Sequence, residues 1–168
     1  MQGPRRFGRL LALLVFAAAL TLAASPANAV LPPKREISRE SATIVLANCG
    51  NGVVLTESYT IVSTATFFFN DNGLVIGAHV HTNFTGVITN SATGNTYNDF
   101  SHFTVIADFL EGGFAVHGMN FAVTILGVGI VVHETGTVIH DLDTNIVFQA
   151  GPHQVINGMA PDFCSVFV

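Results

Sequence analysis

The sequence predicts an all-β protein, an antiparallel up-and-down β-barrel of about six to eight long strands. Three observations support this class. Clusters of Gly, Asn and Asp recur at regular intervals after residue 42, the runs between them are rich in Val, Ile, Thr and Phe, and no run has capped amphipathic helical spacing. Tight turns between consecutive strands favour a meander, and closing the meander into a barrel removes its exposed edges.

Residues 1–29 have the organisation of a bacterial export signal. Three arginines precede an apolar run at residues 10–22, and a small-x-small cleavage site ends at Ala29. A membrane anchor is the alternative interpretation, but this run of 13 residues is shorter than the roughly 20 needed to span a bilayer. We therefore expect a secreted protein that begins at Val30 and keeps no stable membrane anchor.

The remaining chain is expected to consist of an arm and one domain. Residues 30–41 contain two prolines and every basic residue of the mature chain, which predicts a flexible N-terminal arm. The single barrel domain then occupies residues 42–168. We expect its long strands at 53–69, 74–90, 95–111, 114–126, 129–140 and 145–150, with short strands near 43–47 and 163–167.

Cys49 and Cys164 are the only cysteines. In an exported protein, an even pair at opposite ends of a domain indicates one structural disulfide. A metal or redox pair is the alternative, but it favours close spacing such as Cys-x-x-Cys. We therefore predict a Cys49–Cys164 bridge between the first and the last strand.

The charge distribution excludes several functions. The formal net charge is −5, and all six basic residues precede position 40. From Glu40 onward there are ten carboxylates and seven histidines, but no Lys or Arg. Such a chain has no means to neutralise phosphates, which argues against nucleic-acid binding and against a lysine-containing phosphate loop. No cofactor-binding motif is present, so we expect no cofactor.

Alternation along the strands predicts a ligand site on one face of the sheet. If the turn at 70–73 sets the register of the first hairpin, Glu57 faces Gly86 and Tyr59 faces Phe84. A four-residue loop at 91–94 places Asp99 opposite Gly86 and Ser101 opposite Phe84. The predicted site lies in the barrel mouth, with apolar walls and a few polar groups. It consists of Glu57, Tyr59, Gly86, Asp99 and Ser101.

Burial of Glu57 and Asp99 together would raise a carboxyl pKa, so either could act as a general acid or base. The alternative is that this end of the face is simply open to solvent.

A group of histidines occupies the opposite face. His79, His81, His102 and His117 could converge on zinc or copper, since histidines at i and i+2 on a strand share a face. A turn at 112–113 would place Asp108 opposite His117. The alternatives are an ordinary exposed polar face and an acid sensor, because histidines are the main titratable cations. The remaining histidines, His133, His140 and His153, fall into no group.

Three segments carry a resemblance to small secreted actinobacterial proteins: His79-Val80-His81-Thr82-Asn83-Phe84-Thr85-Gly86, Ser101-His102-Phe103-Thr104 and Ala150-Gly151-Pro152-His153-Gln154. The resemblance covers most of the mature chain and implies no activity and no catalytic residue. In architecture alone, the meander is similar to lipocalin-like and allene-oxide-cyclase-like barrels. It departs from lipocalins because it has no Gly-x-Trp motif and no Trp at all.

We therefore expect a secreted β-barrel that binds a small apolar molecule in its interior. An alternative on the same barrel is an enzyme, a cyclase or isomerase that uses Glu57 or Asp99 for proton transfer. A third class is a structural or surface protein that self-associates through exposed strands and needs no pocket.

Overall fold

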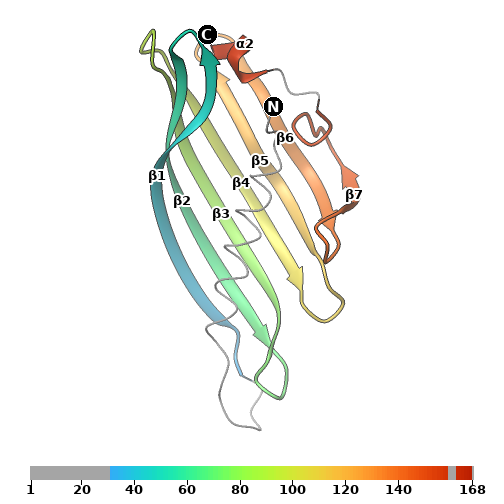
Figure 1. The fold of residues 1–168 in the computed structure, drawn as a ribbon. Helices are drawn as coiled ribbons and strands as arrows, with labels where there is room; N and C mark the ends of the chain where they lie inside the picture. Colours follow the sequence, from blue (N-terminus) through green and yellow to red (C-terminus); the bar gives the residue numbers. More distant parts are fainter. Residues whose placement is uncertain (1–30, 159–161, 168) are drawn as a thin grey trace.

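The computed structural model describes residues 31–158 and 162–167. They form one antiparallel sheet of seven strands in sequence order, followed by a short helix (Figure 1). The all-β class and the up-and-down order are confirmed. The strands are β1 Lys34–Gly50, β2 Val53–Phe69, β3 Val75–Asn90, β4 Thr96–Asp108, β5 Phe114–Ile125, β6 Gly129–His140 and β7 Ile146–Ala150, and the helix is α2 Phe163–Phe167.

The sheet is twisted and has β1 at one edge and β7 at the other (Figure 1). Within the part of the chain that the structure describes, no backbone pairing joins these two strands. Closure into a barrel therefore stays a prediction. The export signal and the Val30 start lie outside the described residues. Among the described helices, none is long and apolar enough to cross a membrane.

Two expected elements differ in the structure. Residues 34–41, expected in the flexible arm, are the first half of β1 and pair with Thr60–Phe67 of β2. This stretch reads Lys-Arg-Glu-Ile-Ser-Arg-Glu-Ser and is rich in charged side chains, a composition that suits the outermost strand of a sheet. Residues 163–167, expected to be a short strand, form the helix α2 instead. The segment 43–47 is not a separate short strand but part of β1.

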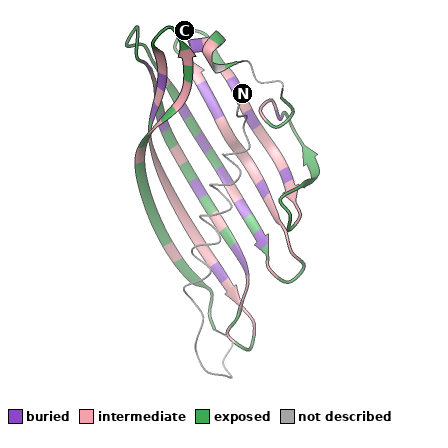
Figure 2. Cartoon of the chain, viewed as in Figure 1, coloured by how far each residue is buried: buried purple, intermediate pink, exposed green. Residues whose placement is uncertain are grey.

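Alternation along the strands separates an inner face, which carries the core, from an outer face. Along β3 and β4, buried residues alternate with exposed ones (Figure 2). The inner face holds two apolar clusters. The end cluster lies under α2 and contains Leu55, Ile88, Val123, Val132 and Phe167, whereas the middle cluster contains Phe103, Val105 and Val116.

The register agrees with the expectation in the β3–β4 hairpin and differs in its two neighbours. Gly86 pairs with Asp99, and Phe84 pairs with Ser101, as predicted. Between β2 and β3 the register is shifted by two residues, so that Gly86 pairs with Tyr59 instead of Glu57. The shift arises at the turn, where a β-bulge separates Phe68 from Phe69. Because side chains alternate with period two, a shift of two residues leaves every residue on its predicted face.

The predicted contact between Asp108 and His117 is wrong. His117 pairs with Thr104, because β4 ends at Asp108 and a longer turn follows. The Asp108 carboxylate stabilises this turn by accepting hydrogen bonds from the backbone N–H groups of Leu110 at 2.8 Å and Glu111 at 3.0 Å.

The Cys49–Cys164 disulfide is confirmed. It joins the end of β1 to α2, and so holds the helix against the end cluster of the inner face. The side-chain amide of Asn90 supports the same contact by donating to the Phe167 carbonyl at 2.7 Å. The end of the domain is therefore closed by one covalent bond and one buried hydrogen bond.

Replacing both cysteines by serine should lower the free energy of unfolding by up to about 4 to 5 kcal/mol, because the bridge restrains the unfolded chain. The bridged residues are 115 positions apart. Urea unfolding of the oxidised protein and of the double variant measures the difference. Equal unfolding midpoints would contradict a stabilising role for the bridge.

Candidate ligand site on the inner face

The inner face of β2, β3 and β4 brings the predicted ligand-site residues together. Tyr59, Gly86 and Asp99 are direct neighbours in one row across the three strands. Glu57 lies two residues before Tyr59, and Ser101 lies two residues after Asp99, so both share the face. Glu57, Asp99 and Ser101 are 1%, 2% and 6% exposed. All five residues therefore lie together on one face, where Tyr59 is half-buried and the other four are buried.

Gly86 makes room for the side chains around it. A Cβ atom at this position would lie 2.6 Å from Oε1 of Glu57 and 2.9 Å from Cε1 of Phe84. The Glu57 carboxyl and the Phe84 ring therefore meet over the glycine backbone. The Phe84 ring also stacks on Tyr59, with ring centroids 5.3 Å apart.

Glu57 and Asp99 are buried next to each other, and the backbone N–H groups of Phe100 and Ala122 lower the pKa of Asp99 only in part. Among the described residues, no group meets hydrogen-bond geometry with any of their four carboxylate oxygens. Burial raises the pKa of Asp99 to about 9, and the neighbouring Glu57 carboxyl adds to the rise. Burial also raises the pKa of Glu57, an effect that its interaction with Asp99 opposes. The pair therefore retains a proton at neutral pH, and a protonated Asp99 can donate to Glu57.

Tyr59 adds a neutral polar group beside this pair. Burial raises the pKa of Tyr59, and the carboxylates of Glu40 and Glu57 raise it further. The phenol therefore stays protonated, and its hydroxyl is able to donate a hydrogen bond to a bound molecule.

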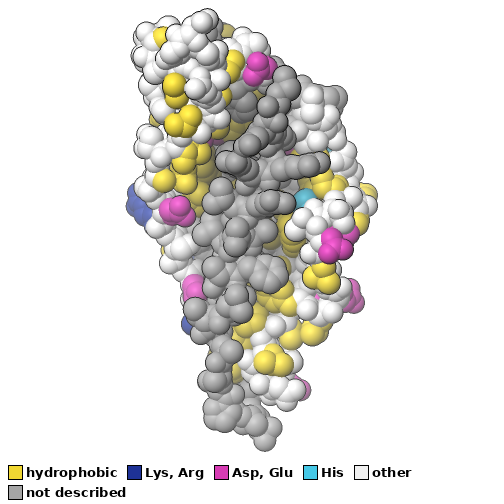
Figure 3. Space-filling model, viewed as in Figure 1, with side chains coloured by type: hydrophobic (Ala, Val, Ile, Leu, Met, Phe, Trp, Pro, Cys, Tyr) yellow, Lys and Arg dark blue, Asp and Glu magenta, His cyan; other side chains and the backbone are white. Residues whose placement is uncertain are grey.

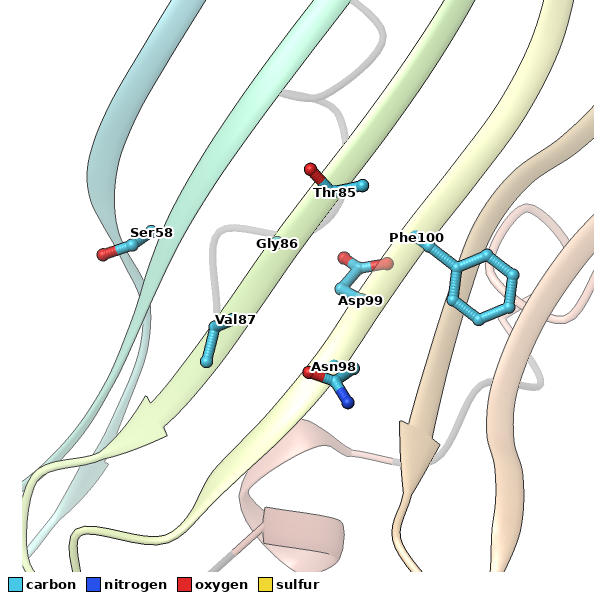
Figure 4. A pocket seen from close by; sticks show the side chains of 7 residues that line it. All are labelled: Ser58, Thr85, Gly86, Val87, Asn98, Asp99 and Phe100. Carbon is cyan, nitrogen blue, oxygen red and sulfur yellow. The ribbon is translucent and has the colours of Figure 1, made fainter.

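The structure also has a hollow of about 290 Å³ on the other side of the same strands (Figure 4). The hollow is lined by Ser58, Thr85, Gly86, Val87, Asn98, Asp99 and Phe100. Most of these residues alternate with Glu57, Gly86 and Asp99 along their strands, and so belong to the outer face. Glu57, Tyr59 and Ser101 do not line it. Gly86 and Asp99 line the hollow and also belong to the predicted ligand site, so the hollow adjoins that site from the outer face.

The four histidines of the predicted metal site do not gather. Among the residues that the structure describes, no group of three or more His, Cys, Asp or Glu is placed to hold a metal ion. Each histidine instead contacts a side chain on an adjacent strand. The contacts are His81–Thr104 at 2.8 Å, His102–Asn83 at 2.7 Å, His117–Thr137 at 2.9 Å and an edge-on ring contact of His79 with Phe68.

A buried acid and histidine pair was missed by the sequence analysis. His153 contacts Glu134 through its Nδ1, and the two residues are 1% and 4% exposed. The other Glu134 oxygen accepts hydrogen bonds from the backbone N–H groups of Val155 at 2.9 Å and Ile156 at 3.3 Å. Glu134 thus holds the segment after β7 along β6. No sequence spacing indicates this pair, because its partners meet only when that segment folds back.

Comparisons with protein-family models, curated proteins and solved structures found no match to this chain. The chain is therefore not assigned to a family. The residues of the inner face and their surroundings are therefore what indicates the function of the protein.

Replacing Asp99 by Asn should flatten the dependence of stability on pH. With its pKa raised from 3.8 to about 9, folded Asp99 keeps a proton that the unfolded chain releases, so stability falls as pH rises between these values. At pH 9 we expect Asp99→Asn to be about 1 to 3 kcal/mol more stable than the wild type.

Urea unfolding at pH 5, 7 and 9 measures this effect. Glu111→Gln is the matched control, because Glu111 is an exposed carboxylate in the β4–β5 turn. Parallel curves for the wild type and Asp99→Asn would contradict the buried titration.

Replacing His153 by Ala should lower the free energy of unfolding by about 3 kcal/mol, because it leaves the buried Glu134 carboxylate without its side-chain partner. The control is His102→Ala, since His102 and its partner Asn83 are exposed. Thermal unfolding of both variants checks the difference. A loss for His153→Ala no larger than that of the control would show that the pair is not stabilising.

Proposed function

We propose that the protein is a secreted carrier that binds a small apolar molecule on the inner face of its sheet, where Glu57, Tyr59, Asp99 and Ser101 orient the guest. One observation carries the proposal: in the described part of the chain, no group meets hydrogen-bond geometry with the four oxygens of two nearly fully buried carboxyl groups. Leaving buried polar groups unpaired costs free energy, so native proteins rarely do so without a functional reason.

The position of the pair supports the same interpretation. Glu57 pairs with Ile88 and Asp99 pairs with Val123, so both carboxyl groups adjoin the end cluster and interrupt its apolar surface. Figure 3 shows hydrophobic side chains of the described strands on the face viewed there. Binding sites for small molecules typically combine such apolar walls with a few polar groups that set the orientation of the guest.

Export is the second part of the proposal. The expected export signal supports it, and the Cys49–Cys164 disulfide is compatible with it, because disulfides persist in oxidising surroundings. A carrier that acts outside the cell would also benefit from the covalent link between α2 and β1, which maintains the end of the domain.

An enzyme of cyclase or isomerase type is the second candidate. A protonated Asp99 beside the ionisable Glu57 would supply a proton donor and a proton acceptor at one place, as acid and base chemistry requires. Self-association through the open edges of β1 and β7 is the third candidate.

Mass spectra of the protein recovered from a producing culture test these candidates. Under native conditions we expect the mass of the chain plus that of a small molecule, and under denaturing conditions the chain alone, beginning at Val30. A bare chain that also takes up nothing from a lipid extract would contradict the carrier and favour the enzyme, and native multimers without a guest would favour self-association.

A further inference from the structure

We propose that the guest of the inner face is a hydrophobic amine, whose ammonium group binds between the carboxyl groups of Glu57 and Asp99. This inference rests on the proposed carrier function and names the chemical class of its guest. It follows from the distribution of charges, hydrogen-bond acceptors and aromatic rings around the pair.

Among the described residues, no Lys or Arg is placed at this site. The basic residues of the described chain are Lys34, Arg35 and Arg39, all on β1. Lys34 is already paired with Glu36 at 2.7 Å. The two arginines pair with Thr66 and Val62 of β2, which belong to the outer face. A bound cation would therefore supply the countercharge that the described residues do not.

The inner face also has an excess of acceptors. No described group meets hydrogen-bond geometry with the four carboxylate oxygens of Glu57 and Asp99, although the backbone N–H groups of Phe100 and Ala122 lower the pKa of Asp99. The side-chain oxygen of Asn120, in the β5 bulge that adjoins this part of β4, is buried without a donor as well. An ammonium group offers three N–H donors and no acceptor, whereas a hydroxyl offers one donor and a carboxylate offers none. An amine fits this excess best.

Aromatic rings border the same space. Phe84 Cε1 and Glu57 Oε1 both approach the position above Gly86, and the Phe84 ring stacks on Tyr59. Ring faces attract cations, and the attraction increases when the cation is desolvated. The rings therefore favour an ammonium group and also pack against the apolar part of the guest.

A proton shared by the two carboxyl groups leaves the pair with one negative charge, which a single ammonium group neutralises. A carboxylate or phosphate guest would instead add a second negative charge in a buried site, which is unfavourable. The site should therefore discriminate by charge among molecules with the same apolar body.

Octylamine, 1-octanol and octanoate are matched probes, because they share one alkyl chain and differ in the head group. Both tyrosines of the protein, Tyr59 and Tyr97, lie on the inner face, and the chain has no Trp, so tyrosine fluorescence reports binding there. We expect octylamine to bind at pH 7 about tenfold more tightly than octanol, and octanoate to bind most weakly.

Glu57→Gln should weaken octylamine binding about tenfold and octanol binding much less, because octanol carries no charge. Glu111→Gln is the control and should change neither affinity. If Glu57→Gln does not fold, as judged by circular dichroism, Asp99→Asn provides the same comparison.

Equal affinities for octylamine and octanol would overturn the amine inference and leave the carrier standing. Octylamine binding that is unchanged in folded Glu57→Gln would also overturn the inference, because the amine would bind elsewhere. If none of the three probes binds, the carrier proposal fails and the inference fails with it.

Discussion

The burial of Glu57 beside Asp99 is the constraint on which the inner face depends. Two carboxyl groups in an apolar face cannot both be ionised at low cost, so one of them keeps a proton. A Cβ at position 86 would displace the Glu57 carboxyl and the Phe84 ring, so glycine allows both to lie where they do. The interruption of the apolar core, the raised pKa of Asp99 and the excess of acceptors all follow from this pair.

Two different interactions hold the C-terminal segments of the described chain against the sheet. The Cys49–Cys164 disulfide and the hydrogen bond from Asn90 hold α2 over the end cluster. The Glu134–His153 pair holds the segment after β7 along β6. Both links join residues that are distant in the sequence. The disulfide joins residues 115 positions apart, and the Glu134–His153 pair joins residues 19 positions apart. These links hold the C-terminal segments against the sheet, although no described backbone pairing joins β1 to β7.

Composition and site geometry point to the same chemistry. A chain without Lys or Arg after Arg39 has no internal countercharge for buried carboxylates. Most of its carboxylates are exposed, where solvent stabilises them, and Glu134 is satisfied by His153 and two backbone amides. Glu57 and Asp99 alone among the described carboxylates are buried with no group in hydrogen-bond geometry with their oxygens. This contrast between Glu134 and the Glu57–Asp99 pair is the reason for proposing that a cationic guest binds to the pair.

Local pattern in the sequence determined the all-β class, the bounds of β2, the disulfide and the face on which Glu57, Asp99 and Ser101 lie. Alternation is a local property. The predicted faces are therefore correct, although the predicted register of the first hairpin is wrong by two residues. Tertiary structure alone decided that residues 34–41 extend β1, that 163–167 is helical, that Asp108 stays apart from His117 and that Glu134 meets His153. These features depend on bulges, on edge pairing and on a segment that folds back across the sheet, and such contacts between distant residues leave no periodic signal in the chain.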